Sequence, residues 1–320
     1  MDTSSKILVT GATGQIGSEL VLELRRRFGG EKVVAAFHNR SASEEIIRGG
    51  PVVKVDLTSE EGLEAILQEH QVAQVYHLAA VLSAVGEKDP QAAWRTNTGS
   101  LYKLLEAGRK LKLERIFWPS SIAVFGPTSP RVRTPQDTVM TPTSMYGVTK
   151  VAGELLCNYY HRRYGLDVRS VRYPGIVSSE THPGGGTTDY AVEVFYEAIA
   201  KGRYTCFVRQ DTRLPMMYMP DCLKCAVDIM QAAPERIRRH DAYNVTSMSF
   251  SAGELVSEIR RHLPQLMVDY RPDHRQAIAD SWPMSLDDTE ARDDWGWAPE
   301  HDLPSMVRDM MTKLTLRLRK

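Results

Sequence analysis

A tyrosine and a lysine four residues apart, Tyr146 and Lys150, are the side chains of this chain best suited to proton transfer. The i,i+4 spacing places both on one face of a helix. A free phenol titrates near pH 10, which is too high for an effective base at neutral pH. An ammonium group stabilises a nearby phenolate, so we expect Lys150 to help lower the pKa of Tyr146.

A serine can complete this pair. Ser120 and Ser121 follow the apolar run 116–118, and Ser121 lies 25 residues before Tyr146. At the carboxyl end of a strand, where α/β sheets build their sites, the Ser121 hydroxyl can hold a substrate oxygen while Tyr146 exchanges its proton. A Tyr-x-x-x-Lys pair alone is often only an exposed helix pair, so its meaning depends on the elements around it.

A glycine-rich turn, Thr10-Gly-Ala-Thr-Gly-Gln-Ile-Gly17, stands between an apolar run and a helical pattern. Here Gly11 permits a tight turn, Gly14 lets the backbone approach a pyrophosphate, and Gly17 allows close packing of the helix on the sheet. The helix N-terminus supplies N–H donors for phosphate. This context predicts a dinucleotide site, where the positive charge of an oxidised nicotinamide would also lower the pKa of Tyr146.

Short apolar runs alternate with helical patterns over the first 175 residues, at 7–10, 33–37, 52–55, 75–78, 115–118 and 168–173. This alternation is typical of the α/β class with a Rossmann-type doubly wound parallel sheet. Later helices are expected over 189–200, over 220–230 with Asp221 as N-cap, and over 251–263 with a capping box at Ser251 and Glu254. We expect a dinucleotide-binding domain over 1–176 and, over 177–320, mainly a smaller C-terminal α/β substrate lobe, with some segments returning to the first domain.

The residues after the second predicted strand leave the choice of dinucleotide open. An acid usually stands there to hold the adenosine ribose, but this chain has Phe37, followed by His38, Asn39 and Arg40. Asn39 can bond a ribose hydroxyl, whereas Arg40 could stack on adenine or pair with a 2′-phosphate. These residues are therefore compatible with NAD and with NADP.

Composition removes several classes of protein. The chain has 40 Lys+Arg against 40 Asp+Glu, so it lacks the positive surplus typical of proteins that bind nucleic acid or anionic membranes. No window reaches about 18 consecutive apolar residues, and the N-terminus lacks the pattern of a secretion signal, so we expect a cytoplasmic protein. Cys222 and Cys225 have no further ligands at zinc-site spacing; we expect reduced helix cysteines and no metal.

Together these motifs resemble the extended short-chain dehydrogenase/reductase family, nearly end to end, through 10–17, 77–80, Asn97, 120–126 and 146–150. Longer segments are similar to the short-chain subgroup that oxidises L-threonine at C3: 117–126, 172–176, 183–190, 214–221 and 281–288. The resemblance implies NAD as cofactor, L-threonine as substrate, 2-amino-3-oxobutyrate as product and a homodimer through two helices of the cofactor domain. Members of this subgroup usually end the second strand in Ser-Asp, where this chain has Ala36-Phe37.

The resemblance also implies roles for individual residues. Tyr146 would be the base, Lys150 its electrostatic partner and a ribose ligand, and Ser121 the anchor of the substrate hydroxyl. Further cofactor contacts are implied at Gly11, Gly14, Gln15, Ile16, Gly17, Asp56, Leu57, Leu78, Ala79, Ala80, Asn97, Tyr173, Pro174 and Ile176.

The charged ends of an amino acid also need partners. Ser83, Thr187 and the backbone around Gly184 can bind the carboxylate, and Asp189 can bind the ammonium group or simply cap the helix that it begins. The glycines at 184–186 form a hinge, so we expect the loop 178–189 to order over the amino acid and exclude water.

Two other functions share part of these motifs. A nucleotide-sugar 4-epimerase or dehydratase uses the same Ser/Tyr/Lys set, but a dehydratase would want an acid beside Ser121, where this chain has Ile122. The apolar segment 214–220 suits a small substrate, or packing, better than a nucleotide diphosphate. A dinucleotide-sensing regulator without catalysis is disfavoured because it has no need of an ionisable phenol beside a cation.

Overall fold

The computed structural model describes residues 5–182 and 184–318. Residues 1–4, part of the N-terminal segment on which the expectation about a secretion signal rests, lie outside the described residues, and so does residue 183, the first of the segment 183–190. No helix in the described part of the chain is both long and apolar enough to cross a bilayer.

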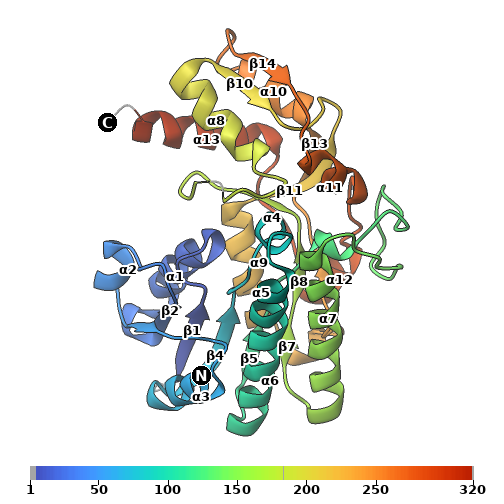
Figure 1. Cartoon of the computed structure of the whole chain (residues 1–320). Helices are drawn as coiled ribbons and strands as arrows, with labels where there is room; N and C mark the ends of the chain where they lie inside the picture. The colour runs from blue at the N-terminus through green and yellow to red at the C-terminus, as the bar shows by residue number, and fades with distance from the viewer. Residues whose placement is uncertain (1–4, 183, 319–320) are drawn as a thin grey trace.

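A six-stranded parallel sheet in the order β3-β2-β1-β4-β5-β7 forms the lower part of the molecule (Figure 1). The order reverses between β1 and β4, so the carboxyl ends of these strands open the crevice in which doubly wound sheets bind ligands. This confirms the predicted doubly wound parallel sheet. Its strands are β1 (Lys6–Thr10), β2 (Val33–Phe37), β3 (Val52–Lys54), β4 (Val72–His77), β5 (Arg115–Phe117) and β7 (Val168–Arg169).

Helices cover both faces of this sheet because alternate strand residues point to opposite sides. Leu8 of β1 packs in a core with α3, α6 and α7, whereas Ile7 and Val9 pack in another core with α1, α9 and α12. The helices of this part are α1 (Gln15–Phe28), α2 (Glu44–Arg48), α3 (Glu60–Glu69), α4 (Ser83–Gly86), α5 (Pro90–Trp94), the π-helical turn η2 (Arg95–Gly99), α6 (Ser100–Leu111), α7 (Met145–Tyr164), α9 (Met219–Gln231) and α12 (Thr289–Trp295).

The predicted strand 168–173 is divided, because its two halves have different partners. Val168 and Arg169 pair with β5, whereas Val171–Tyr173 forms β8 between β6 and β12. A further small sheet has the order β13-β11-β9. The strands of these two sheets are β6 (Ser120–Ser121), β8 (Val171–Tyr173), β12 (Tyr243–Asn244), β9 (Gly175–Val177), β11 (Arg213–Tyr218) and β13 (Met248–Ser251).

The upper part of the molecule is a smaller α/β lobe with its own apolar core (Figure 1). It contains α8 (Tyr190–Lys201), β10 (Arg203–Cys206), α10 (Ala252–Arg260), β14 (Met267–Tyr270), α11 (Arg275–Ser281) and α13 (Leu303–Leu318). The predicted capping box is confirmed: Ser251 accepts from the Glu254 N–H, and the Glu254 carboxylate accepts from the Ser251 N–H.

The predicted N-cap at Asp221 is wrong, because α9 begins at Met219. The Asp221 carboxylate instead accepts the backbone N–H groups of Glu300 and His301, which ties the segment after α12 to this helix. The domain boundary at residue 176 stays a prediction, although α9 and α12, which lie beyond it, pack on the large sheet.

Candidate active site

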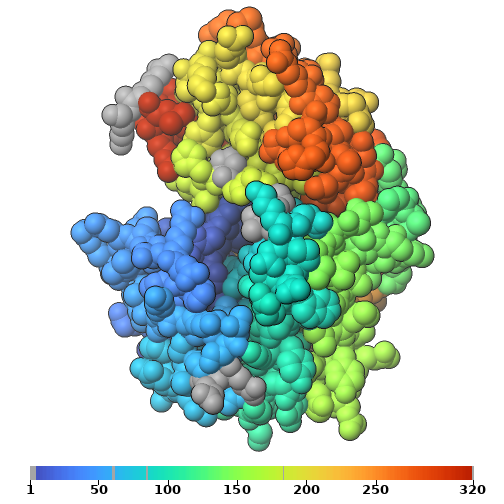
Figure 2. All heavy atoms as spheres, viewed as in Figure 1, coloured from blue at the N-terminus to red at the C-terminus, as the bar shows by residue number. Residues whose placement is uncertain are grey.

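One cavity of about 230 Å³ lies where the turn after β1, the end of β4, strand β6, helix α7 and the segment after β9 meet. Figure 2 shows the surface hollowed between the two parts of the molecule, above the blue N-terminal elements. Residues from seven separate stretches of sequence converge on it: 11–17, 78–83, 119–122, 146–150, 173–176, 186–189 and 282. The predicted site residues that line it are Gly11, Gly14, Gln15, Ile16, Gly17, Leu78, Ala80, Ser83, Ser121, Tyr146, Lys150, Tyr173, Pro174, Ile176, Thr187 and Asp189.

The glycine turn has the geometry of a cradle for an anionic group. Gly11 has φ +68° and lies so close to the end of β4 that a Cβ here would stand 2.7 Å from the Ala79 nitrogen. A Cβ on Gly17 would stand 2.1 Å from the Gly11 oxygen. Gly14 is the N-cap of α1 and offers no side chain to the first N–H groups, which have no partner within a helix. The turn therefore fits the pyrophosphate of a dinucleotide.

Helix α7 carries the Tyr146 and Lys150 pair into the cavity. The Ser144 hydroxyl caps this helix by accepting the Gly147 N–H at 3.1 Å. Lys150 is buried; its Nζ donates to the Pro119 carbonyl at 2.6 Å and lies 5.4 Å from the centre of the Tyr146 ring. Ser121 lines the same cavity, near enough to Tyr146 to oppose part of the rise in its pKa, and its Oγ accepts the Ala123 N–H at 3.2 Å. The three predicted catalytic side chains therefore share one site.

Burial dominates the electrostatics of Tyr146 and Lys150 in the polypeptide. Burial raises the pKa of Tyr146 to about 12, and the nearby Ser121 side chain only partly opposes this. Burial also lowers the pKa of Lys150 to about 7, although the nearby Cys157 and Glu154 oppose that shift. Desolvation therefore dominates the pKa values of both groups in the polypeptide. The predicted lowering of the Tyr146 pKa depends on Lys150 together with an oxidised nicotinamide, and it stays a prediction.

A buried ion pair holds together the elements that carry Ser121 and Lys150, and the sequence analysis did not predict it. Glu154, one turn after Lys150 on α7, pairs with Arg172 through two 2.9 Å hydrogen bonds, from Nε and Nη2. Its carboxylate also accepts from the Ser120 hydroxyl at 2.5 Å. The i, i+4, i+8 spacing of Tyr146, Lys150 and Glu154 was the available signal. The pair joins α7 to β6 and β8, which carry Ser121 and Tyr173.

Asn97 lies outside the cavity and supports its wall. It is buried in the π-helical turn η2, where its Oδ1 accepts the Val81 N–H at 2.7 Å and its Nδ2 donates to the Val81 carbonyl at 3.0 Å. Nδ2 also donates to Thr149 Oγ1 at 3.1 Å. These bonds connect the segment after β4 to α7. Direct contact of Asn97 with the cofactor stays a prediction.

The residues predicted to contact adenosine lie apart from the cavity. Asn39 and Arg40 are exposed after β2, and Asp56 is exposed after the neighbouring strand β3. The Asp56 carboxylate accepts from the Thr58 N–H at 2.8 Å and from the Thr58 hydroxyl at 2.7 Å. Leu57 packs against the α3 side of the sheet. All four stay predictions as cofactor contacts.

Two of the predicted substrate contacts, Thr187 and Asp189, come from the segment before α8. Thr187 is buried, and within the described residues its Oγ1 has no hydrogen-bond partner. Asp189 stands at the N-cap position of α8 without bonding the helix; its Oδ2 instead accepts the N–H groups of Gly185 at 2.7 Å and Gly186 at 2.6 Å. Burial raises the pKa of Asp189, and these backbone bonds oppose the shift. Gly184 does not line the cavity, and closure of its loop stays a prediction.

Trp282 is a lining residue that sequence reasoning did not assign. It is buried at the end of α11, more than 90 residues after Asp189 in the chain, and Arg131 donates to its carbonyl at 3.3 Å. Nothing local in the sequence signals this placement. By contrast, the apolar segment 214–220 is mostly strand β11 and lines no part of the cavity, so its role is packing.

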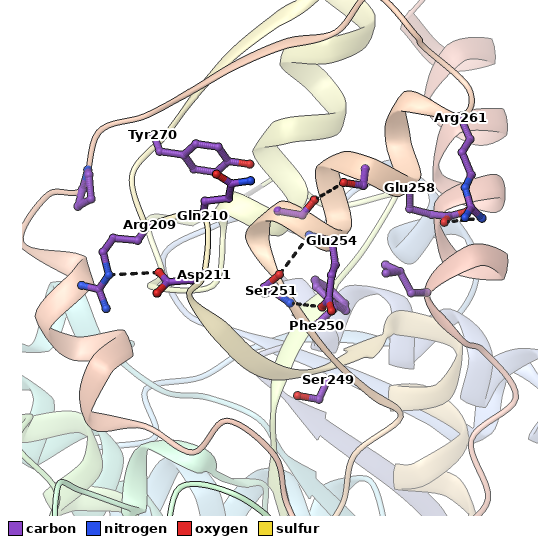
Figure 3. A pocket seen from close by; sticks show the side chains of 14 residues that line it. Arg209, Gln210, Asp211, Ser249, Phe250, Ser251, Glu254, Glu258, Arg261 and Tyr270 are labelled. Atoms are coloured by element: carbon purple, nitrogen blue, oxygen red, sulfur yellow. Dashed lines mark hydrogen bonds and ion pairs between the residues drawn. The ribbon is translucent and has the colours of Figure 1, made fainter.

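A larger hollow of about 1090 Å³ lies in the upper lobe beside α10 (Figure 3). Its charged side chains already have partners: Arg209 pairs with Asp211 at 3.3 Å and Arg261 with Glu258 at 2.9 Å. We assign it no chemistry. Within the described residues no three His, Cys, Asp or Glu side chains cluster to hold a metal, and all four cysteines are free thiols.

Comparisons with known proteins place these features in context. Residues 7–246 match the model of the NAD dependent epimerase/dehydratase family. The chain is 44% identical over 307 residues to the mitochondrial L-threonine 3-dehydrogenase of Bos taurus, covering 96% of this chain and 82% of the relative.

Two solved structures are also similar over nearly the whole chain. An L-threonine dehydrogenase from Cupriavidus necator in its holo form has a TM-score of 0.94 and 47% identity, covering 97% of this chain and 99% of that one. A monomeric L-threonine 3-dehydrogenase from a metagenome has a TM-score of 0.93 and 45% identity, covering 98% and 100%.

Proposed function

Because this chain belongs to the NAD dependent epimerase/dehydratase family, we propose that it oxidises L-threonine at C3 to 2-amino-3-oxobutyrate and transfers the hydride to a nicotinamide dinucleotide. One observation carries the proposal: the cavity joins a phosphate cradle, the Ser121–Tyr146–Lys150 group and the buried Oγ1 of Thr187, whose hydrogen-bonding capacity is unused within the described residues. This is the set that a dinucleotide and a small hydroxylated amino acid require.

The mechanism assigns Tyr146 as the base that takes the proton of the C3 hydroxyl. Ser121 holds that hydroxyl oxygen, and the Ala123 N–H fixes the Ser121 side chain. The bound nicotinamide supplies the hydride acceptor and a positive charge that favours the Tyr146 phenolate. Lys150, whose Nζ is held by the Pro119 carbonyl 5.4 Å from the centre of the Tyr146 ring, would bind the ribose of the dinucleotide. The buried walls exclude water and align the reacting atoms.

The substrate's charged groups face the loop side of the cavity. Ser83, Thr187 and the backbone around Gly184 are proposed to bind the carboxylate, and Asp189 the ammonium group. Asp189 also holds the N–H groups of Gly185 and Gly186, so it organises the loop that the carboxylate would meet. Ser83, Thr187 and Asp189 line the same cavity as the glycine turn.

NAD is the proposed dinucleotide, in contact with the glycine turn, Leu78, Ala79, Ala80, Tyr173, Pro174 and Ile176. The Tyr173 hydroxyl donates to the Cys222 carbonyl at 2.8 Å, so this residue offers the face of its ring as a wall. Asn39 and Arg40, with Asp56 and Leu57, are proposed to meet adenosine. Because Phe37 stands where the ribose-binding acid usually lies, activity with NAD should be compared with activity with NADP.

The decisive assay follows the absorbance of reduced nicotinamide with L-threonine and either NAD or NADP. Reduction that depends on threonine is expected, with NAD preferred. Turnover of a UDP-sugar without threonine oxidation would favour the epimerase alternative, and dinucleotide binding without turnover would favour a sensor. Tyr146→Phe should lower kcat at least a hundredfold while dinucleotide affinity stays within a few-fold. Retained turnover would mean that another group is the base.

A homodimer through α6 and α7 is proposed as the assembled form. Large apolar side chains are exposed along these two helices: Tyr102, Val148, Leu155, Tyr159 and Tyr164. Covering them would remove apolar area from water, which is the main driving force of association. The metagenomic relative is described as monomeric, so this state requires measurement. We further propose a cytoplasmic location and a role in threonine catabolism.

A further inference from the structure

Two side chains on α1 hold the chain that leaves strand β9. Gln15 Nε2 donates to the Ile176 carbonyl at 3.5 Å, and Glu19 Oε1 accepts from the Ser178 hydroxyl at 2.6 Å. Four residues of helix advance about 6 Å and two residues of extended chain advance about 6.6 Å. The i,i+4 pair on α1 therefore matches the i,i+2 pair on the extended segment, so the two elements are held in register.

The segment beyond Ser178 is held from both lobes. Glu19 Oε1 also accepts from the Thr181 hydroxyl at 3.4 Å, while Ser178 Oγ accepts the N–H groups of Glu180 at 3.0 Å and Thr181 at 3.2 Å. From the upper lobe, Arg317 of α13 donates to the carbonyls of Ser179 and Glu180 at 3.0 and 2.8 Å. Figure 1 shows α13 above α1, in the opposite lobe.

This arrangement connects Glu19 through the chain to two parts of the cavity lining. The first turn of α1 belongs to the phosphate cradle, and the segment that Glu19 holds follows Ile176 and precedes Thr187 and Asp189, all three of which line the cavity. Glu19 is half-buried and does not line the cavity. Glu19 can therefore affect catalysis only by changing the position of the segment that it holds.

We propose that Glu19 is a positioning residue for amino-acid binding, an inference that rests on the proposed function. Glu19 fixes the start of the loop 178–189 relative to the glycine-rich turn 10–17. The bound amino acid needs both parts of the cavity lining at once, whereas the dinucleotide needs mainly α1 and the sheet edge. Loss of the Glu19–Ser178 bond should consequently weaken substrate binding and spare cofactor binding.

The test compares Glu19→Ala, Glu19→Gln and Ser178→Ala with a control, Glu23→Ala. Glu23 lies one turn further along α1, and its partners within the described residues are Arg26 and Arg27 at the surface. We expect Glu19→Ala and Ser178→Ala each to raise KM for L-threonine about tenfold, with kcat and dinucleotide Kd within about twofold of wild type. Glu19→Gln keeps an acceptor oxygen and should stay within about threefold in KM, like the control.

Two further measurements separate positioning from mere stability. Backbone amides at 179–182 should exchange with deuterium about tenfold faster in Glu19→Ala without any ligand, and at the wild-type rate in Glu19→Gln. The double variant Glu19→Ala with Ser178→Ala should raise KM by less than the product of the two single effects, because both single variants remove the Glu19–Ser178 bond.

Unchanged KM and unchanged exchange in the Glu19→Ala and Ser178→Ala variants would overturn the role of Glu19, as would an equal loss of dinucleotide affinity. If Glu19→Ala does not fold, Ser178→Ala still removes the bond from the other side. A wild-type protein that does not oxidise L-threonine would instead overturn the proposed function, and the exchange comparison would still decide the role of Glu19.

Discussion

Replacement of Glu154 by alanine should remove the strongest internal support of the catalytic group. The variant loses three hydrogen bonds, from the Ser120 hydroxyl at 2.5 Å and from Arg172 Nε and Nη2 at 2.9 Å each. The Arg172 guanidinium is buried and keeps its Nη1 bonds to the Gln136 carbonyl and Asn244 Oδ1, a weak Nη2 contact with the Met140 sulfur at 3.6 Å, and its position 5.3 Å from the centre of the Phe125 ring, none of which offers a negative charge. Leaving one partner of a buried pair uncompensated typically costs about 3–5 kcal/mol.

That loss is a large part of the roughly 5–15 kcal/mol by which native domains are stable. Urea unfolding followed by tryptophan fluorescence should show a lower midpoint with an unchanged m-value. In the folded variant kcat should also fall, because Ser121 follows Ser120 directly and Lys150 lies one turn before position 154. Dinucleotide affinity should change less, since the glycine turn lies on another element.

Glu23→Ala is the matched control, because it removes an exposed ion pair that should contribute less than about 1 kcal/mol. The loss of stability in Glu154→Gln should lie between those of Glu154→Ala and Glu23→Ala, since the amide oxygen can still accept one of the three bonds. A loss below about 1 kcal/mol in Glu154→Ala, or a loss equal to that of the control, would refute the reasoning that this buried pair supports the site.

Three other predictions test separate features. Trp282→Ala should lower kcat/KM for L-threonine about tenfold, with longer 2-amino-3-hydroxy acids less affected; the exposed Trp94→Ala should change neither, and equal effects would show that Trp282 does not shape the cavity. His77 is buried, and burial lowers its pKa to about 3, so the folded state holds this imidazole neutral. The unfolded chain takes up a proton near pH 6.5, so the free energy of unfolding should fall by a few kcal/mol as the pH drops from about 6.5 toward 3. Urea unfolding at several pH values should show this loss in the wild type and less of it in His77→Gln; an identical pH profile would contradict it. Leu155→Glu on α7 should shift the protein from dimer to monomer in sedimentation velocity, whereas the equally exposed Leu316→Glu should not; a monomeric wild type would refute the proposed interface.

Much of the fold could be predicted because its signals are local. Strands buried on both faces need continuous apolar runs, and a tight turn against a neighbouring strand needs glycine at Gly11. The capping box at Ser251 and Glu254 is a short-range exchange of hydrogen bonds, so four residues of sequence suffice to predict it. Asp221 shows the limit of this logic: its local position suggested a cap, but the tertiary fold gives its carboxylate backbone partners about 80 residues away.

The sequence by itself determined the chemistry available to this protein: a glycine cradle, a phenol and an amine on one helix face, and a serine at a strand end. Only the tertiary structure decided their environment. Burial raises the Tyr146 pKa because desolvation depends on everything packed around the phenol, which no local spacing encodes. The same holds for Glu154 with Arg172, for Trp282 and for Glu19 with Ser178, because each acts through partners that folding brings from distant parts of the chain.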